Sequence, residues 1–195
     1  VDVDAYAAFV RQWEHHPGFD FAVIPDVIDG TEEDNAKMCA RWLQQLPRTL
    51  PAAVVWHLHE SFERLEYLIR CTQAGVFTRV CLGSSGQWST PGTEDWWRRM
   101  DAVREVACDS DGRPLVKLHG LRMLSPTIFA HIPLASADST NVAANIGKDV
   151  KWKGTYQPIT EMQRALVLAE RIEMHAVAVT WSKRHGTQMN LELVW

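Results

Sequence analysis

The sequence predicts an α/β domain of the TIM-type (β/α) barrel class. Short apolar runs alternate with amphipathic helical segments along the chain, a pattern that indicates right-handed βαβ units and a parallel sheet. Nearly every expected strand ends in a glycine or a reactive polar residue, as in barrels whose strand ends together build one site. An open doubly wound sheet is the alternative, but the stretch Gly83-Ser84-Ser85-Gly86 lacks the spacing of a dinucleotide-binding fingerprint.

The first part of the chain predicts two helices around one strand. Asp4 can cap a helix that runs to about residue 15, where Pro17-Gly18 follows. A strand is expected at 21–24, and Thr31 can cap the next helix. The apolar stripe of the first helix is expected to consist of Tyr6, Phe9, Val10 and Trp13, and that of the second of Met38, Cys39, Trp42, Leu43 and Leu46.

The middle of the chain predicts two more strands. The run 52–58 is continuously apolar, which is typical of a strand buried on both faces. Ser61 can cap the following helix, and Gly75 stands where a left-handed residue would end it. After a strand at 77–82, Thr93 can cap a helix whose buried residues are expected to be Trp96, Trp97, Met100 and Val103.

The last part predicts strands at 115–118 and 132–137, with a short helix starting at Ser125-Pro126 between them. Thr160 and Gln163 form a capping box that opens a C-terminal helical segment from about residue 160. Its apolar side is expected to consist of Met162, Leu166, Ala169, Ile172 and Val179.

Composition limits the class of protein. The chain has 195 residues, of which 46% are hydrophobic and 23% charged, with a net charge of -4. These values fit a single domain over residues 1–195 and exclude both a disordered chain and a basic nucleic-acid coat. Four scattered cysteines without a C-x-x-C pair predict reduced thiols. With no long apolar span and no signal peptide in the sequence, we expect a cytoplasmic protein.

The first two strand ends carry residues that can bind or react. Asp26 follows the strand at 21–24, where a carboxylate either orders a loop or contacts a ligand. His57 and His59 lie at the end of the second strand, and residues two apart on a strand point to one face. Both imidazoles are therefore expected in one pocket.

The third and fourth strand ends are rich in small residues. Gly83 and Ser84 open a loop whose backbone N–H groups can hold an oxyanion, or where a flat ring can approach the backbone. His119 and Gly120 follow the fourth strand.

Asp138 is the carboxylate that best fits a catalytic role. It follows the fifth apolar strand and precedes several hydroxyl residues, and this setting suits a nucleophile that has to stay ionised. The structural alternative is a cap for a helix from Asn141 onward.

Taken in order, these strand ends resemble the tRNA-guanine transglycosylase superfamily, most of all its small phage and bacterial relatives that place deazapurines in DNA. Asp26 falls where that family has its base-recognising aspartate. His57-Leu58-His59-Glu60-Ser61 lies where the tRNA enzymes carry V-Q-G-S, which puts His59 at the base-reading glutamine.

Three later segments extend the resemblance, which spans about residues 18 to 145. Val80-Cys81-Leu82-Gly83 looks like the G-L-A-V-G strand of the family. His119-Gly120-Leu121 with Ser125-Pro126 resembles its M-G-V-G-x-P segment. Asp138 matches the catalytic aspartate of its F-D-x-x-x-P-T-R motif.

The resemblance implies a base-exchange enzyme of queuosine-related chemistry. Asp138 would attack the sugar of an extruded guanine nucleotide and form a covalent intermediate. The partners would be nucleic acid, DNA ahead of tRNA, and a free 7-deazapurine base; no membrane, organic cofactor or metal is implied, and a homodimer is left open. The base-binding residues would be Asp26, His57, His59, Gly83, Ser84, His119 and Gly120.

The chain departs from the tRNA enzymes in three ways, which favour the smaller relatives. No P-T-R follows Asp138, no cysteine cluster could hold their structural zinc, and histidine replaces the base-reading glutamine. The family's general acid/base aspartate lies in a D-S-G type motif on an early strand, and nothing before Phe19 supplies it. We therefore expect the last five βα units of a barrel, with the N-terminal strands upstream of Val1, and expect these residues alone to be inactive.

Two other functions compete with base exchange. His-x-His on a barrel strand is typical of metal-dependent hydrolases, and such an enzyme would use His57, His59, His119 and Asp138. The chain could instead be a non-catalytic barrel that serves as a binding module.

Overall fold

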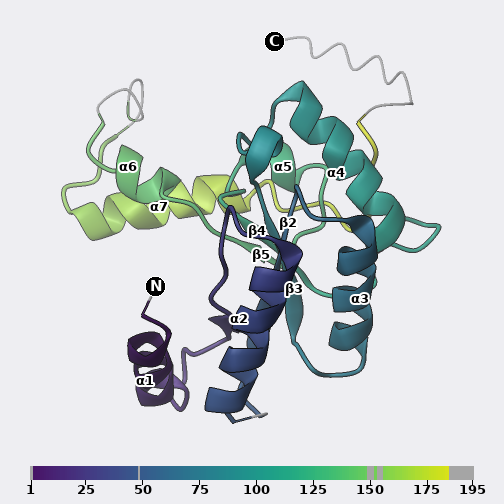
Figure 1. The fold of residues 1–195 in the computed structure, drawn as a ribbon. Coiled ribbons are helices and arrows are strands. Elements are labelled where there is room, and N and C mark those ends of the chain that lie inside the picture. The colour runs from purple at the N-terminus through teal and green to yellow at the C-terminus, as the bar shows by residue number, and fades with distance from the viewer. Residues whose placement is uncertain (1, 48, 149–151, 153–155, 185–195) are drawn as a thin grey trace.

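A five-stranded, all-parallel sheet forms the centre of the computed structural model, which describes residues 2–47, 49–148, 152 and 156–184 (Figure 1). The strands follow one another across the sheet in sequence order. A doubly wound sheet reverses its strand order partway, whereas a barrel adds each strand beside the last. The fold is therefore α/β with a curled half-barrel sheet, and the described residues do not close a full TIM barrel. The strands are β1 Ala22–Val23, β2 Ala52–His57, β3 Arg79–Gly83, β4 Leu118–Leu121 and β5 Ser136–Ala137.

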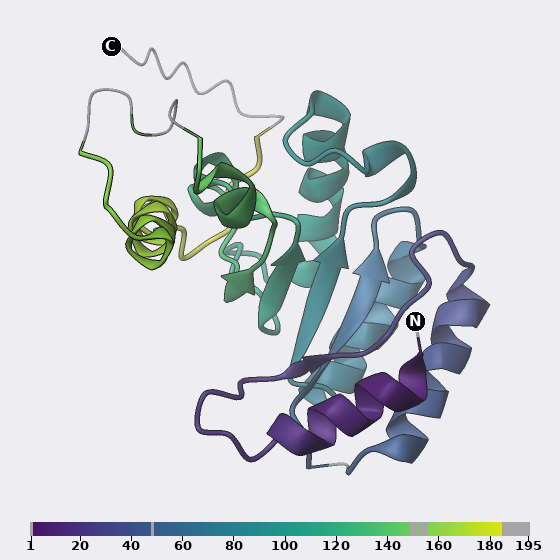
Figure 2. The same ribbon diagram turned by 90° about the vertical axis from the view of Figure 1, so that its left-hand side faces the viewer.

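Helices cover one face of the sheet and both of its edges. Figure 1 shows α2, α3 and α4 along the same side of the strands. In Figure 2, α1 lies at the β1 edge and α7 beyond the β5 edge. The helices are α1 Val3–Trp13, α2 Glu32–Gln45, α3 Phe62–Gln73, α4 Glu94–Ala107, α5 Pro126–Phe129, α6 Asn141–Asn145 and α7 Glu161–Glu173, with a 3₁₀ turn at Gly86–Trp88.

Most predicted helix starts are confirmed by side-chain caps. Thr31, Ser61, Thr93 and Thr160 each accept a backbone N–H from the first turn of α2, α3, α4 and α7. The prediction for α1 is wrong, because Asp2 rather than Asp4 is its cap and accepts the N–H groups of Asp4 and Ala5. Asp4 instead reaches across to α2, where it binds Arg41 and Gln45.

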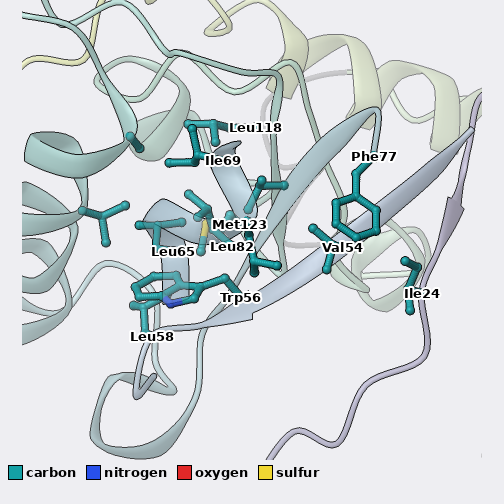
Figure 3. Close-up of a cluster of buried hydrophobic side chains, with 14 of the residues drawn as sticks. Ile24, Val54, Trp56, Leu58, Leu65, Ile69, Phe77, Leu82, Leu118 and Met123 are labelled. Carbon is teal, nitrogen blue, oxygen red and sulfur yellow. The ribbon is translucent and has the colours of Figure 1, made fainter. Parts of the chain in front are cut away.

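The face of the sheet toward the helices, which we call the outer face, carries the main core. Val54, Trp56 and Leu82 of the sheet belong to one buried cluster with Leu65 and Ile69 of α3 (Figure 3). All five side chains are almost completely buried. The opposite, inner face carries a much smaller apolar cluster, centred on Ala53, Val55 and Cys81.

All five strands differ from their expected limits; the first two differ by one residue at one or both ends, and the other three differ more. The fourth strand begins at Leu118 rather than 115, because residues before it turn back on α4: Leu115 N–H donates to Ala107 O, and Cys108 bridges Pro114. The fifth strand is confined to Ser136–Ala137, since Ile132 still belongs to the hydrogen bonds that close α5. The third begins at Arg79 rather than 77.

The apolar faces predicted for α1 and α7 are partly wrong, and on α2 the predicted Leu43 is exposed. On α7, Met162 and Leu166 are 71% and 62% exposed, while Leu168 and Ile172 are the buried residues. On α1, Phe9 and Trp13 are exposed, and Val3, Ala7 and Val10 pack inward. Both helices lie at an edge of the sheet and are buried along a narrow strip, so the larger apolar side chains are not the ones selected.

All four cysteines, Cys39, Cys71, Cys81 and Cys108, are free thiols, as the sequence predicts. Over the part of the chain that the structure describes, no helix has both the length and the apolar character needed to cross a bilayer.

Candidate functional site

A cavity of about 210 Å³ opens at the carboxyl ends of the strands. It brings together five of the residues predicted from the sequence, which are Asp26, His57, Gly83, Ser84 and Asp138. Three further residues, Ile28, Leu121 and Arg122, also line it and were not predicted as site residues. Because parallel strands all point the same way, loops far apart in sequence meet at this edge of the sheet. The volume is below the range of about 300–1,000 Å³ typical of sites for drug-sized ligands, and suits a small planar group.

His57 and Asp26 form a close pair on one side of the cavity. His57 Nε2 lies 2.7 Å from Asp26 Oδ2, and the imidazole is almost completely buried. The pair is close in distance but not in angle: among the described residues neither ring nitrogen of His57 has a hydrogen-bond partner of good geometry. A buried ring with unsatisfied nitrogens is costly unless something else bonds it. His57 is thus the side chain most available to a ligand in the cavity.

Gly83 makes room for this imidazole. A Cβ at residue 83 would come within 2.8 Å of His57 Nδ1. The carbonyl of Gly83 already accepts the N–H of Leu58, so the carbonyl is not free for a ligand. Gly83 therefore contributes space, and any other residue there would displace His57.

A buried polar network fixes the loop that carries Asp26 relative to the end of β2. Glu60 Oε2 accepts the backbone N–H of His57 at 2.9 Å, and Glu60 Oε1 accepts Asn35 Nδ2 at 3.0 Å. Asn35 Oδ1 in turn accepts the N–H of Val27, next to Asp26. Arg64 Nε lies 3.2 Å from Glu60 Oε1 and balances its charge. No role was predicted for Asn35 or Glu60. The available signal was that Asn35 lies on the stripe of α2 that otherwise carries apolar residues.

Asp138 stands on the other side of the cavity and is held as a carboxylate. His119 Nε2 lies 3.5 Å from Asp138 Oδ2, and the backbone N–H of Arg122 donates to Oδ1 at 2.9 Å. The hydrogen bond from His119 is the main reason why the pKa of Asp138 lies below its usual value; partial burial opposes this, and the Arg122 N–H and nearby positive charge add to it. An ionised, half-exposed carboxylate at a cavity mouth can act as a nucleophile or bind a cation.

Arg122 has a strained backbone. Its φ is 60°, the one positive φ found for a residue other than glycine among the described residues. Such conformations cost on the order of 1–3 kcal/mol and are concentrated at functional sites. Here the strain turns the Arg122 N–H toward Asp138 and places the side chain at the cavity. No sequence pattern indicates this conformation, because His119-Gly120-Leu121-Arg122 has the composition of an ordinary strand end.

Ser84 lines the cavity with its hydroxyl group anchored from behind. Trp96 Nε1 of α4 donates to Ser84 Oγ at 3.0 Å. Since a hydroxyl both accepts and donates, the Ser84 proton is still free to bond a ligand.

Three predicted site residues do not line the cavity. His119 is not in the lining, although it bonds Asp138, which is. His59 is beside the cavity but not in its lining: Nδ1 bonds Ser85 Oγ at 2.7 Å and Nε2 bonds the Gly30 carbonyl at 3.2 Å, so both ring nitrogens tie loops together. Gly120 faces the outer side, where a Cβ would come within 2.8 Å of Met123 and Leu134 side-chain atoms. Its carbonyl accepts the N–H of Asp138.

The metal-site alternative gains no geometric support. The described residues contain no group of three or more His, Cys, Asp or Glu side chains placed to hold an ion. His59 points away from Asp138, and His119 Nδ1 is bonded to Ser136 Oγ at 2.8 Å.

A larger cavity of about 540 Å³ lies at the opposite end of the sheet, near Trp42, Leu46, Leu50 and Val76. The described residues that line it include no ionisable side chain, so it offers no group for acid, base or nucleophilic chemistry. The smaller cavity is lined by two carboxylates and one imidazole, and a second imidazole, His119, bonds one of the carboxylates; it is the candidate site.

No family model, no curated protein and no solved structure matches the chain.

Proposed function

We propose that the protein exchanges bases in nucleic acid, replacing guanine by a deazapurine through a covalent intermediate on Asp138. The five described strands would then be the last five of the eight in a transglycosylase barrel. The observation that carries the proposal is that the ionised carboxylate of Asp138 and the close pair of Asp26 and the buried His57 line one small cavity at the carboxyl ends of the strands. Sequence resemblance supplies the reaction, and the cavity geometry is compatible with it.

In the first step, an Asp138 carboxylate oxygen would bond to the anomeric carbon of an extruded guanine nucleotide. The bond from that carbon to the base nitrogen breaks, and the electron pair leaves with the guanine. The resemblance assigns the accompanying proton transfer to an aspartate on an earlier barrel strand, N-terminal to the five described here. In the second step, a ring nitrogen of the incoming base would attack the same carbon and give its proton to the aspartate that the resemblance assigns to the earlier strand. The bond to Asp138 breaks, and its electron pair returns to the carboxylate.

His119 and the Arg122 N–H favour this nucleophile by keeping it ionised. An aspartate that had to lose a proton first would be a weaker nucleophile at neutral pH. The two groups also fix the direction of the carboxylate, because they bond one oxygen each.

Asp26 and His57 would bind the base. A purine edge presents donors and acceptors side by side, and a carboxylate beside an imidazole offers complementary partners. Neither ring nitrogen of His57 makes a hydrogen bond of good geometry, and Ser84 has a hydroxyl proton that can bond a ligand in the same cavity. Gly83 supplies the space in which the imidazole lies against the backbone.

The test is covalent trapping on the intact protein. Guanine-containing DNA and tRNA are each incubated with the protein, and adducts are detected on a denaturing gel. Asp138→Asn should abolish the adduct, a loss of at least about 1,000-fold in its rate of formation. Asp111→Asn, which changes an exposed carboxylate in the α4–β4 turn, is the matched control and should leave the adduct unchanged.

Two results would overturn the proposal. One is an adduct that survives Asp138→Asn. The other is the absence of both adduct and labelled-guanine exchange with every guanine-containing nucleic acid tried. A result with DNA alone or with tRNA alone decides which polymer is the substrate.

A further inference from the structure

Four polar side chains form a row across the inner face of the sheet. Ser136 and Asp138 are two residues apart at β5, so both point to that face. His119 pairs with Ser136 in the β4–β5 register, which places its ring between them. Arg79 enters from β3, on the same side as Cys81, whose register partner is His119.

These side chains are joined by successive hydrogen bonds. Arg79 Nη1 donates to Ser136 Oγ at 3.1 Å, and Ser136 Oγ lies 2.8 Å from His119 Nδ1. His119 Nε2 then lies 3.5 Å from Asp138 Oδ2. The row therefore runs from a buried guanidinium to the carboxylate at the cavity.

The two ends of the row fix the direction of the bonds between them. A guanidinium can only donate and an ionised carboxylate can only accept. Once Ser136 Oγ accepts from Arg79, its own proton is available for the neighbouring acceptor, His119 Nδ1. The imidazole proton then has to be on Nε2, where it faces the acceptor oxygen of Asp138.

The other states of His119 fit less well. With the proton on Nδ1 alone, the Nε2 lone pair would face a carboxylate oxygen. With both nitrogens protonated, Ser136 Oγ would accept from two cationic donors, and the Ser136 proton would no longer have the lone pair of His119 Nδ1 as its acceptor.

Charged and aromatic neighbours are consistent with this arrangement. Asp20 balances Arg79, with Oδ1 at 3.0 Å from Nη2. Phe21 lies between the two basic groups: its ring is 3.8 Å from the Arg79 guanidinium carbon and meets the His119 ring edge-on at 5.3 Å. The Cys81 thiol beside His119 is neutral, because burial raises its pKa to about 12. Asp26 and Arg122 add further charges near the row, at the cavity.

We propose that Arg79 and Ser136 are positioning residues that hold His119 as the neutral tautomer with its proton on Nε2, so that this N–H is directed at Asp138. Neither residue touches the cavity. Their effect on catalysis rests on the proposed function, whereas the tautomer itself does not.

The experiment is ¹⁵N NMR of the histidine side chains in the full chain at neutral pH, with His119 assigned by its loss in His119→Gln. In the wild type, Nε2 should show the shift of a protonated nitrogen and Nδ1 that of an unprotonated one. Ser136→Ala should remove this preference and give averaged shifts for the two nitrogens. Ser136→Thr keeps the hydroxyl and should restore the wild-type pattern.

Arg79→Lys and Arg79→Met provide a second test at the other end of the row. Lysine keeps a donor and a charge, so the Nε2–H tautomer should persist, and methionine should weaken it. Circular dichroism shows whether each variant is folded. If an Arg79 variant is unfolded, the comparison of Ser136→Ala with Ser136→Thr still tests the proposal, because Ser136 is only half-buried.

A wild-type Nδ1–H tautomer, a doubly protonated ring, or an Nε2–H preference that survives Ser136→Ala would overturn the assignment. In the exchange assay, Ser136→Ala should slow adduct formation at least about tenfold without changing the Kd for nucleic acid. If the tautomer responds as expected and the adduct rate does not, the hydrogen-bond assignment holds and its catalytic role is wrong.

Discussion

The two faces of the same sheet are built for different purposes. On β3, Val80 and Leu82 point outward into the main core, whereas Arg79, Cys81 and Gly83 point inward. The outer face is almost entirely apolar and covered by helices. The inner face carries a buried guanidinium and a row of hydrogen bonds that ends at a cavity.

This difference separates stability from chemistry within each strand. Consecutive residues alternate between faces, so one strand can serve the core with every second side chain and the site with the others. Substitutions on the outer face should therefore change the free energy of unfolding most. Those on the inner face should change binding and reactivity.

The largest expected effect is on the outer face. Trp56 is completely buried, and its Nε1 donates to Ser61 O at 3.0 Å. Trp56→Ala should lower the free energy of unfolding by about 3–5 kcal/mol, because it leaves a large cavity and an unpaired carbonyl. The change is measured by urea denaturation monitored through the far-UV circular dichroism of the helices, because the variant lacks one of the tryptophans that a fluorescence signal would report.

Adjacent valines give the matched comparison between the faces. Val54 belongs to the large outer cluster and Val55 to the small inner one, and both are nearly inaccessible to solvent. We expect Val54→Ala to cost about 2–3 kcal/mol and Val55→Ala about 1 kcal/mol. Equal costs would show that the inner face supports the fold as strongly as the outer one.

The next effect concerns the strained residue at the cavity. Arg122→Gly and Arg122→Ala both remove the guanidinium, but only glycine relieves a φ of 60°. The glycine variant should therefore be more stable than the alanine variant by about 1 kcal/mol in denaturant titrations. This is the reverse of the usual order in regular structure.

If the proposed substrate is right, the two Arg122 variants should bind nucleic acid equally weakly. Each should reduce the slope of log affinity against log salt by about one, as for the loss of a single phosphate contact. A glycine variant that is less stable than alanine would show that no strain is stored there.

The smallest effect is the pH dependence from Asp138. Its folded-state pKa is lower than in the unfolded chain, so the carboxylate contributes stability that is present at neutral pH and disappears as pH falls through the folded pKa, below about pH 4. Because the side chain is 56% exposed, we expect only a few tenths of a kcal/mol. Asp138→Asn should lack this acid-dependent loss. The test is to measure the free energy of unfolding of both proteins at steps of about one pH unit between about pH 6 and pH 3. Parallel curves would contradict the pKa assignment.

Much of the scaffold was predictable from local pattern. Helix caps at Thr31, Ser61 and Thr93 were found because a cap depends on residues within one turn. Asp26, His57 and Asp138 were identified as neighbours because parallel strands end at one edge. The exact strand limits were less predictable, since they depend on hydrogen bonds to partners distant in sequence.

The role of each site residue was harder to predict. Two residues apart on a strand, His57 and His59 would point to the same face, yet only His57 lines the cavity. The strand ends at His57, and His59 bonds Gly30 and Ser85 instead. Arg79 was passed over within an apolar strand, and its partner Ser136 lies 57 residues later.

By itself, the sequence determined the order of elements, the caps and the set of polar strand ends, because these follow from local periodicity and hydrogen bonding within a few residues. Only the tertiary structure decided which polar groups meet, which helix faces are buried, and in which direction the row from Arg79 to Asp138 donates its protons. The physical reason is that these outcomes depend on contacts between segments brought together by the curl of the sheet, and no local pattern encodes such distances.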